Sequence, residues 1–339
     1  MKAAVLKAFG EPFVIEEVPV PSIGPDDVLI KVAACGLCGT DVKISAGKRK
    51  DTPLPHIQGH EVSGVIHEVG ANVSGLKAGD RGVVHFYCSC HKCEYCLSDR
   101  ETLCQHMPGR LGFTMDGGLA EYVAAPATNF IPIPDSVTLK DASILADAIS
   151  TSYRGLKKGN VGPGTRVLVV GLGGLGIHAC QLAQAMGADV VGTTRSMEKI
   201  DYARSFGLEK YVQAGGDSAQ QIIAAFGGHK ADVVIETVTN PQTLPIDMAV
   251  MAPSARLVLL GYSFDVPMSI PAYPLVQDEL SIYASRASSH GDIAATLPWL
   301  ESGKIRAAIS NTYSLDEINV AMDQLRAGQC LGRQVILFE

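Results

Sequence analysis

Four closely spaced cysteines are the first residues whose types and positions could do chemistry. They lie in a polar, loop-like segment and are Cys90, Cys93, Cys96 and Cys104. Four thiolates at such spacing could close a tetrahedral zinc site with no open position, and a site of that kind is structural. An iron–sulfur cluster is one alternative, but such motifs continue with a nearby Cys-Pro that is absent here. Disulfides or free thiols are the others, and we interpret Cys88 as a bystander.

A thiol and an imidazole form a second, dispersed pair. Cys38 follows a predicted strand, and His60 lies on a later predicted loop in the sequence Gly-His-Glu. On neighbouring loops they could hold two corners of a catalytic zinc and leave a position for a substrate. Taken alone, Cys38 also fits a small buried side chain or a redox pair with Cys35. His60 taken alone also fits a surface loop.

A glycine-rich turn between a strand and a helix is the third feature. A β-branched run ends at Val170, and Gly171, Gly173 and Gly176 follow before an apolar stretch of helical period. The first glycine allows a tight turn, the second lets the backbone approach a pyrophosphate, and the third lets the helix pack close to the strand. The motif predicts a dinucleotide site, with a structural turn as the alternative. Its residues are Gly171, Leu172, Gly173, Gly174, Leu175 and Gly176.

The elements that must position these residues change in character along the chain. Residues 1 to about 140 hold short β-like runs separated by Gly and Pro, which predicts a β-rich, barrel-like domain with long loops. From about residue 165, strand-like and helix-like segments alternate, which predicts a doubly wound parallel sheet. The expected strands of this sheet are 167–170, 190–194, 233–236 and 256–261, and the expected helices are 174–187, 197–206 and 242–251. After about residue 285 we expect helices near 292–302 and 315–327 and a strand at 334–338.

The composition is typical of a globular α/β enzyme of two domains. The chain has 339 residues, a formal net charge of −7 and 47% hydrophobic residues. A negative net charge argues against non-specific binding to nucleic acid or to anionic membranes. The sequence holds no 18-residue apolar run and begins as a strand rather than as a signal peptide. Clustered cysteines favour metal over disulfides, so we expect a cytoplasmic protein.

Taken together, these motifs resemble the zinc-dependent medium-chain alcohol dehydrogenases, over the full length and in order. The stretch 59–73, Gly-His-Glu-x2-Gly-x5-Gly-x2-Val, is similar to the family's zinc signature. The four cysteines lie where that family keeps a structural zinc, and 111–122 and 332–337 resemble its linker and its terminal strand. The resemblance implies a GroES-like catalytic domain over 1–150 and 286–339, with a Rossmann nucleotide-binding domain, 151–285, inserted between.

The resemblance also implies the ligands of a catalytic zinc. Cys38 and His60 match the first two ligands of the family, and Asp147 matches the third, where many members have Cys. Aspartate is a competent zinc ligand, and the Cys, His, Asp set keeps the two negative charges of a Cys, His, Cys set. A helix-capping or solvent-facing Asp147 is the alternative. Glu61 matches a carboxylate that acts beside the zinc.

Other functional residues carry over one by one. Thr40 matches the hydroxyl that takes the alcohol proton, with a simple turn threonine as the alternative. Many relatives have histidine at the position of Lys43, so solvent could replace the outer part of the proton relay. Thr151 matches a contact to the nicotinamide and Arg333 a contact to the pyrophosphate. Ordinary surface roles are the alternatives for both.

The end of the second strand of the nucleotide domain indicates which cofactor is preferred. An NAD enzyme normally has Asp or Glu there, to accept from the ribose 2′-hydroxyl, but this chain has Thr194. Arg195 and Ser196 follow at once and Lys199 comes on the next helix, and these groups suit a 2′-phosphate. The sequence therefore predicts NADP. The alternative is NAD, with Arg195 as a solvated loop cation.

These observations lead to one main prediction and two alternatives. The chain is predicted to be an NADP-preferring, zinc-dependent oxidoreductase that interconverts alcohols with aldehydes or ketones and binds two zinc ions. One alternative is an NAD-dependent polyol or sugar dehydrogenase of the same family. The other is a non-catalytic nucleotide-binding protein stabilised by zinc. We expect a homo-oligomer, a tetramer by analogy, with small-molecule substrates and no nucleic-acid or membrane partner.

Overall fold

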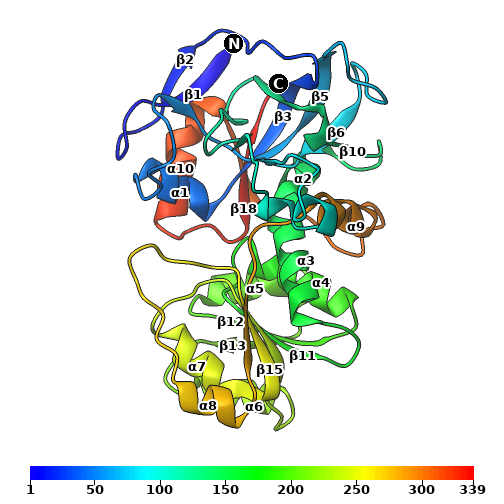
Figure 1. Ribbon diagram of the computed structural model, residues 1–339. Coiled ribbons are helices and arrows are strands. Elements are labelled where there is room, and N and C mark those ends of the chain that lie inside the picture. The colour runs from blue at the N-terminus through cyan, green and yellow to red at the C-terminus, as the bar shows by residue number, and fades with distance from the viewer. The chain divides into compact units, whose positions relative to one another are not determined.

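The structure, a computed structural model, describes residues 1–339, and its contacts divide the chain into two compact units. Unit 1 comprises 1–147, 288–301 and 309–339, and unit 2 comprises 148–287 and 302–308. Unit 1 therefore combines the blue N-terminal strands of Figure 1 with its red C-terminal elements. Residues 302–308 group with unit 2, whereas the resemblance assigns all of 286–339 to the first domain. No helix is long and apolar enough to span a membrane.

Unit 1 is β-rich, and its largest sheet has the order β10-β6-β5-β3-β18-β17, with β9 also paired to β3. Two small sheets, β2-β1-β4 and β7-β8, complete it. The strands are β1 Lys2–Leu6, β2 Val14–Glu17, β3 Asp27–Leu37, β4 His56–Ile57, β5 Glu61–Val69, β6 Arg81–Val84, β7 Tyr87–Cys88, β8 Gly109–Arg110, β9 Tyr122–Pro126, β10 Phe130–Pro132, β17 Ile309–Ser314 and β18 Arg333–Leu337. The helices are α1 Gly39–Ser45, α2 Leu139–Ser143, α9 His290–Glu301 and α10 Ile318–Arg326, with short 3-10 turns at η1 Cys96–Ser98, η2 Glu101–Leu103, η3 Ala127–Asn129, η4 Ile144–Ala146 and η5 Leu315–Glu317.

Strand β3 brings the candidate metal ligands of unit 1 together. It ends at Leu37, so that Cys38 lies at the start of α1. The antiparallel neighbour β5 places Glu61 opposite Gly36, and the other neighbour, β18, places Gln334 opposite Leu37. A Cβ atom at Gly36 would collide with the Glu61 carboxylate, so glycine is needed for this close approach.

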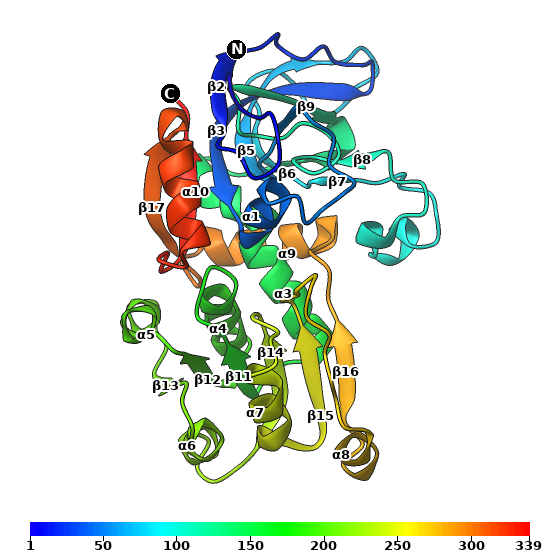
Figure 2. The same ribbon diagram turned by 90° about the vertical axis from the view of Figure 1, so that its left-hand side faces the viewer.

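Unit 2 is built on a six-stranded, fully parallel sheet of order β13-β12-β11-β14-β15-β16 (Figure 2). The order reverses between β11 and β14, which is where doubly wound sheets bind nucleotides. The strands are β11 Arg166–Val170, β12 Asp189–Thr194, β13 Lys210–Gln213, β14 Ala231–Glu236, β15 Met251–Leu259 and β16 Ser281–Ala284. The helices are α3 Ala148–Gly159, α4 Gly176–Ala185, α5 Met197–Arg204, α6 Ser218–Ala225, α7 Thr243–Val250 and α8 Ala272–Gln277. The predicted combination of a β-rich domain with a doubly wound parallel sheet is confirmed.

Among the elements that the sequence analysis did not name, four lie toward the edges of the sheet of unit 2. They are β13, α6, α8 and β16. Helix α8 has no buried residue, and no residue of β16 is fully buried. Such segments lack the continuous apolar run that identifies a buried strand in a sequence. One boundary also differs, because the chain is already extended at Met251, where a helix was expected to end.

Candidate metal centres and nucleotide site

Four potential ligands meet in the interior of unit 1. One ligand atom each of Cys38, His60, Glu61 and Asp147 lies within 4.8 Å of the others, and all four residues are buried. Cys38 Sγ is 3.5 Å from Asp147 Oδ2, and His60 Nε2 is 3.8 Å from the same oxygen. The structure thus brings together the three ligands expected from the resemblance, along with Glu61.

The donor set fits a zinc ion in chemistry and in spacing. Sulfur and oxygen ligands of tetrahedral zinc stand about 3.5 Å apart, which matches the Cys38–Asp147 separation. Burial opposes the thiolate of Cys38, but the charge of Arg333 favours it and lowers the Cys38 pKa. When Cys38, Asp147 and Glu61 are all ionised, one guanidinium leaves two negative charges, the charge that a divalent cation neutralises.

Asp41 is a functional residue that the sequence analysis did not assign. It is fully buried, and its Oδ1 lies 3.2 Å from His60 Nδ1. Burial would lower the His60 pKa, but the Asp41 carboxylate raises it well above its ordinary value. Because Asp41 faces Nδ1, the other ring nitrogen stays directed toward Cys38 and Asp147, as metal-binding histidines require. Asp41 also accepts from the Cys38 backbone N–H at 2.8 Å, which fixes the start of α1.

Arg333 lies inside this cluster. Its Nη2 donates to Asp147 Oδ2 at 2.8 Å and lies 2.6 Å from Glu61 Oε1. Burial opposes its charge, but the negative charges of Cys38, Glu61 and Asp147 raise its pKa. Burial raises the pKa of Glu61. Within unit 1, Arg333 therefore balances the ligand carboxylates, and its contact with a pyrophosphate stays a prediction.

The residues of the expected proton path lie on α1, and the expected nicotinamide contact lies on α3. Thr40 is in the first turn of α1, and its backbone N–H donates to Cys38 Sγ at 3.5 Å. Lys43 is in the last turn of α1, and burial lowers its pKa although the Cys38 charge opposes the shift. Thr151 lies on α3 of unit 2 and is 5% exposed. The predicted nicotinamide contact of Thr151 stays a prediction.

Two aromatic rings enclose His60 and form a wall that the sequence analysis did not identify. The ring of Phe86 lies 5.0 Å from the imidazole and the ring of Phe113 lies 4.9 Å from it, centre to centre. The two phenyl rings stack on each other at 5.5 Å. Such a wall suits an apolar part of a substrate and lowers the local polarity around the metal ligands.

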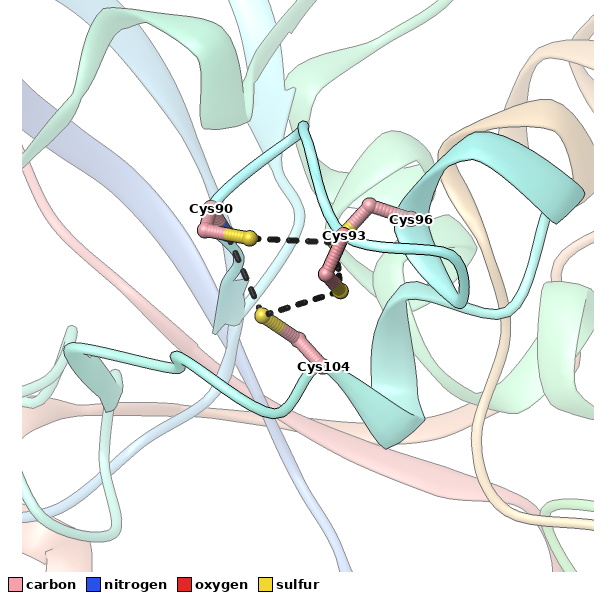
Figure 3. Close-up of side chains that lie close together, drawn as sticks. All are labelled: Cys90, Cys93, Cys96 and Cys104. Atoms are coloured by element: carbon pink, nitrogen blue, oxygen red, sulfur yellow. Dashed lines mark hydrogen bonds between the residues drawn. The ribbon is translucent and has the colours of Figure 1, made fainter.

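The second candidate metal centre comprises Cys90, Cys93, Cys96 and Cys104 (Figure 3). The sulfur atoms lie 3.9 Å apart for Cys90 and Cys96, 3.5 Å for Cys93 and Cys96, and 4.0 Å for Cys93 and Cys104. Two thiolates on tetrahedral zinc stand about 3.8 Å apart, whereas a disulfide bond is about 2.05 Å long. The geometry therefore fits a closed four-thiolate zinc site. Cys88 is not part of it.

The segment that carries these cysteines has little core of its own. None of the four is fully buried, and Leu97 and Leu103 are 75% and 45% exposed. Backbone N–H groups of Cys96 and Gln105 face the sulfur of Cys93 and lower its pKa to about 6, so its thiolate forms readily near neutral pH. A bound metal would supply the cross-link that hydrophobic packing does not.

The fingerprint glycines of unit 2 have the geometry that a pyrophosphate site needs. Gly171 has a φ of +90°, and a Cβ there would also meet Thr237 Oγ1 at 2.5 Å. A Cβ at Gly173 would meet nothing within 4 Å, so the backbone is open to a ligand at this point. At Gly176, which opens α4, a Cβ would collide with the Gly171 carbonyl oxygen. Open backbone before a helix N-terminus suits a phosphate group.

A cavity of about 510 Å³ lies beside this turn. Gly171, Gly173, Thr194, Arg195 and Lys199 are among its lining residues, so three segments of the predicted cofactor site share one cavity. Ser196 differs from the others, because its hydroxyl caps α5 by accepting from the Lys199 backbone N–H at 3.3 Å. The cap leaves the hydroxyl hydrogen of Ser196 available to an anion.

A buried pair of carboxyl groups lies at the edge of the same cavity, and the sequence analysis did not assign it. Asp247 lines the cavity, is 1% exposed and faces the fully buried Glu236. Glu236 Oε1 accepts from the backbone N–H groups of Val238 and Thr239 at 2.5 and 2.8 Å. Burial and the neighbouring Glu236 raise the pKa of Asp247 to about 10. Asp247 is thus the protonated partner, and the pair fixes the turn that follows β14.

Comparisons with known proteins place both units in one family. Residues 24–135 match the alcohol dehydrogenase GroES-like domain, and residues 174–302 match the zinc-binding dehydrogenase domain. An alcohol dehydrogenase of Geobacillus stearothermophilus is 36% identical over 339 residues, which cover 99% of both proteins. An NAD-dependent alcohol dehydrogenase of Sulfurisphaera tokodaii is 30% identical and covers 99% of this chain and 100% of the relative.

Solved structures agree with this assignment. The alcohol dehydrogenase of the hyperthermophilic archaeon Aeropyrum pernix has a TM-score of 0.93 at 29% identity and covers 100% of both chains. A cobalt- and zinc-bound alcohol dehydrogenase of Pyrobaculum aerophilum has a TM-score of 0.90 at 28% identity and covers 100% of this chain and 99% of that chain. The chain belongs to the zinc-dependent medium-chain alcohol dehydrogenase family and is an oxidoreductase.

The four-cysteine centre generates the first prediction. Cys93→Ser should lower the zinc content by about one ion per chain and lower the temperature of unfolding, because the segment would lose its cross-link. Elemental analysis and thermal unfolding measure both effects. The matched control is Cys88→Ala, which removes a nearby thiol outside the centre and should leave zinc content unchanged. Full zinc content in Cys93→Ser would contradict the assignment.

The carboxyl pair generates the second prediction. Folded Asp247 keeps its proton up to a pH of about 10, whereas an unfolded aspartate releases it near its ordinary pKa of about 3.9. Between these values folding takes up a proton, so stability falls as pH rises, by up to about 1.4 kcal/mol per pH unit. Asp247→Asn mimics the protonated form and should raise the unfolding temperature more at pH 9 than at pH 6.

The control for this prediction is Asp201→Asn, which changes an exposed aspartate on α5 of the same unit. Its effect on the unfolding temperature should be small and the same at both pH values. A stability difference between Asp247→Asn and wild type that does not grow with pH would show that Asp247 is charged in the folded protein.

Proposed function

We propose that this chain is an NADP-preferring, zinc-dependent dehydrogenase that interconverts alcohols with aldehydes or ketones. The observation that supports this best is the buried meeting of Cys38, His60 and Asp147, whose donor atoms have the separations of zinc ligands. Closed structural sites use four protein ligands, whereas a catalytic site keeps a position open for a substrate. Glu61, the fourth group of the cluster, pairs with the Arg333 guanidinium, as Asp147 also does, and we assign it a place beside the metal.

The proposed roles of the side chains follow from their positions. Bound zinc would supply Lewis acidity to the substrate oxygen, and the nicotinamide would donate or accept the hydride. Cys38, His60 and Asp147 would hold the metal, and Asp41 would keep the imidazole oriented. The Thr40 hydroxyl would pass the alcohol proton outward. The rings of Phe86 and Phe113 would exclude water from the reacting groups.

The cofactor preference rests on the end of β12. Several relatives are named as NAD-dependent enzymes, including the proteins of Sulfurisphaera tokodaii and Sulfolobus acidocaldarius. In this chain Thr194, Arg195 and Lys199 line the cavity, with no carboxylate at the strand end to accept from a ribose 2′-hydroxyl. A guanidinium and an ammonium at that place favour a 2′-phosphate, and this supports NADP.

We also propose two zinc ions per chain, a homo-oligomeric state and a cytoplasmic location. The two separate ligand clusters support the two ions. The edge strand β16 and the adjoining helix α8 expose large apolar side chains, with Tyr273, Val276 and Tyr283 at 76%, 78% and 39% exposure. Contiguous apolar exposure at a sheet edge supports association with a second copy. A reducing compartment would keep the ligand thiols available.

The metal assignment generates the third prediction. Asp147→Asn removes an anionic ligand and should lower kcat/KM by a factor on the order of 10² or more. It should also lower the affinity for zinc in a competition with a chelator. Asp141→Asn, a change at a half-buried aspartate on α2 outside the ligand cluster, is the control and should leave both unchanged. If Asp147→Asn keeps full activity and full zinc content, Asp147 is not the third ligand, and Glu61 becomes the next candidate.

The cofactor assignment generates the fourth prediction. Wild type should have a higher kcat/KM with NADP than with NAD. Arg195→Ala should lower this preference roughly 10- to 150-fold, because a charge-assisted hydrogen bond is worth about 1.5–3 kcal/mol. Thr194→Asp should shift it further toward NAD. The control is Arg204→Ala, which changes an exposed arginine at the end of α5. A wild-type preference for NAD would contradict the proposal.

A further inference from the structure

One buried histidine of unit 2 joins the glycine turn to a distant part of the chain. His178 lies in the first turn of α4 and is 0% exposed. Its Nδ1 lies 2.6 Å from the carbonyl oxygen of Gly174, a residue of the predicted dinucleotide fingerprint. Its Nε2 accepts from the backbone N–H of Ala308 at 3.0 Å. Gly174 and Ala308 both belong to unit 2, so the histidine links two segments of the same compact unit.

The two partners fix the protonation of the imidazole. A backbone N–H can only donate, so Nε2 is the unprotonated nitrogen and accepts from Ala308. A carbonyl oxygen can only accept, so Nδ1 carries the hydrogen and donates to Gly174. His178 is therefore neutral and in a single tautomer when both bonds are formed. A side chain without a donor and an acceptor at this spacing would lose both bonds.

The bond to Gly174 orients a peptide group that the residues of the turn cannot hold by themselves. Gly173 and Gly174 lack a Cβ atom, so local contacts restrict the φ and ψ angles of the turn only weakly. A trans peptide unit is planar, and its C=O and N–H point in opposite directions. Holding the Gly174 oxygen against His178 therefore directs the Leu175 N–H to the opposite side. Leu175 immediately precedes α4, where free N–H groups suit a phosphate.

The bond to Ala308 fixes a segment that lies outside helices and strands. Residues 302–308 connect α9 to β17 and form turns and irregular backbone. Gln181 of α4 pairs with the backbone of Arg306 in this segment. Its Nε2 donates to the carbonyl at 3.0 Å, and its Oε1 accepts from the N–H at 2.8 Å. Residues three apart, such as His178 and Gln181, lie on one face of a helix. This face of α4 therefore binds the segment through three side-chain to backbone bonds.

We propose that His178 is a positioning residue for the cofactor pyrophosphate and couples cofactor binding to the docking of 302–308 on α4. Because both nitrogens belong to one planar ring, a ligand that holds the turn against Nδ1 also holds Nε2 toward Ala308. Such coupling is reciprocal, so the docked segment favours the turn that binds the cofactor. NAD and NADP carry the same pyrophosphate, so this inference goes beyond the proposed NADP preference and does not depend on it.

The first test measures the dissociation constants of NADPH and NADH by fluorescence titration of the zinc-loaded protein. His178→Leu should raise both by the same factor, about 5- to 150-fold, the usual range of a coupling between two sites. His178→Gln should restore most of the affinity, because the oxygen and nitrogen of an amide can accept and donate as the two ring nitrogens do. The matched control is Gln181→Leu. It removes the bonds to Arg306 but not the bond to Gly174, and it should leave both constants near the wild-type values.

Hydrogen–deuterium exchange gives a readout that does not depend on turnover. In wild type, saturating NADPH should slow exchange in peptides that cover 302–308, because the cofactor stabilises the docked segment. In His178→Leu, saturating NADPH should no longer slow this exchange. Gln181→Leu should exchange faster at Arg306 with and without cofactor, but NADPH should still slow exchange at Ala308.

Several results would overturn the proposal. Wild-type exchange in 302–308 that NADPH leaves unchanged would do so, whatever the variants show. So would wild-type affinity for both cofactors in a folded His178→Leu variant. A loss of affinity that is confined to NADPH would assign His178 to the 2′-phosphate instead of the pyrophosphate. Tighter binding of NADH than of NADPH to wild type would contradict the proposed cofactor preference, whereas an equal loss of both affinities in His178→Leu would still support this inference.

Discussion

The pairing of β3 with two antiparallel neighbours is the constraint on which the metal centre of unit 1 depends. Register fixes Glu61 opposite Gly36 on one side and Gln334 opposite Leu37 on the other, so side chains from distant parts of the sequence reach the point where β3 ends. A slip of one residue would turn each of these side chains to the opposite face of the sheet. The hydrogen-bond ladder thereby sets a chemical geometry that no local sequence preference could hold.

Charge compensation is the second organising principle, and it acts in both units. In unit 1 the buried carboxylates of Glu61 and Asp147 share the Arg333 guanidinium. In unit 2 the buried Glu236 and Asp247 face each other directly. Asp247 keeps its proton, so this pair carries one negative charge rather than two. These two solutions have different consequences. The ion-paired cluster stays charged and attracts a metal, whereas the singly protonated pair holds a turn in place.

The sequence predicted those parts of the site that short motifs encode. Cys38, His60, the four clustered cysteines and the fingerprint glycines each lie in a local pattern with a physical reason for its spacing. Asp147 needed the family resemblance, because a lone aspartate before a helix has several ordinary roles. Asp41, Phe113 and Asp247 were not assigned, since their importance depends on contacts across the tertiary structure. The weakly apolar edge elements of unit 2 were not named for the related reason that their sequences carry little periodicity.

The discontinuity of unit 1 has a consequence for the order in which the molecule is made. Strand β18 lies between β3 and β17 and carries Arg333, yet it is synthesised after all of unit 2. During translation, β3 therefore emerges long before its neighbour, while every strand of the parallel sheet is already available for pairing. Domains generally fold as units as they leave the ribosome. The nucleotide-binding fold can thus form first, and the metal centre is completed only when the closing strand arrives.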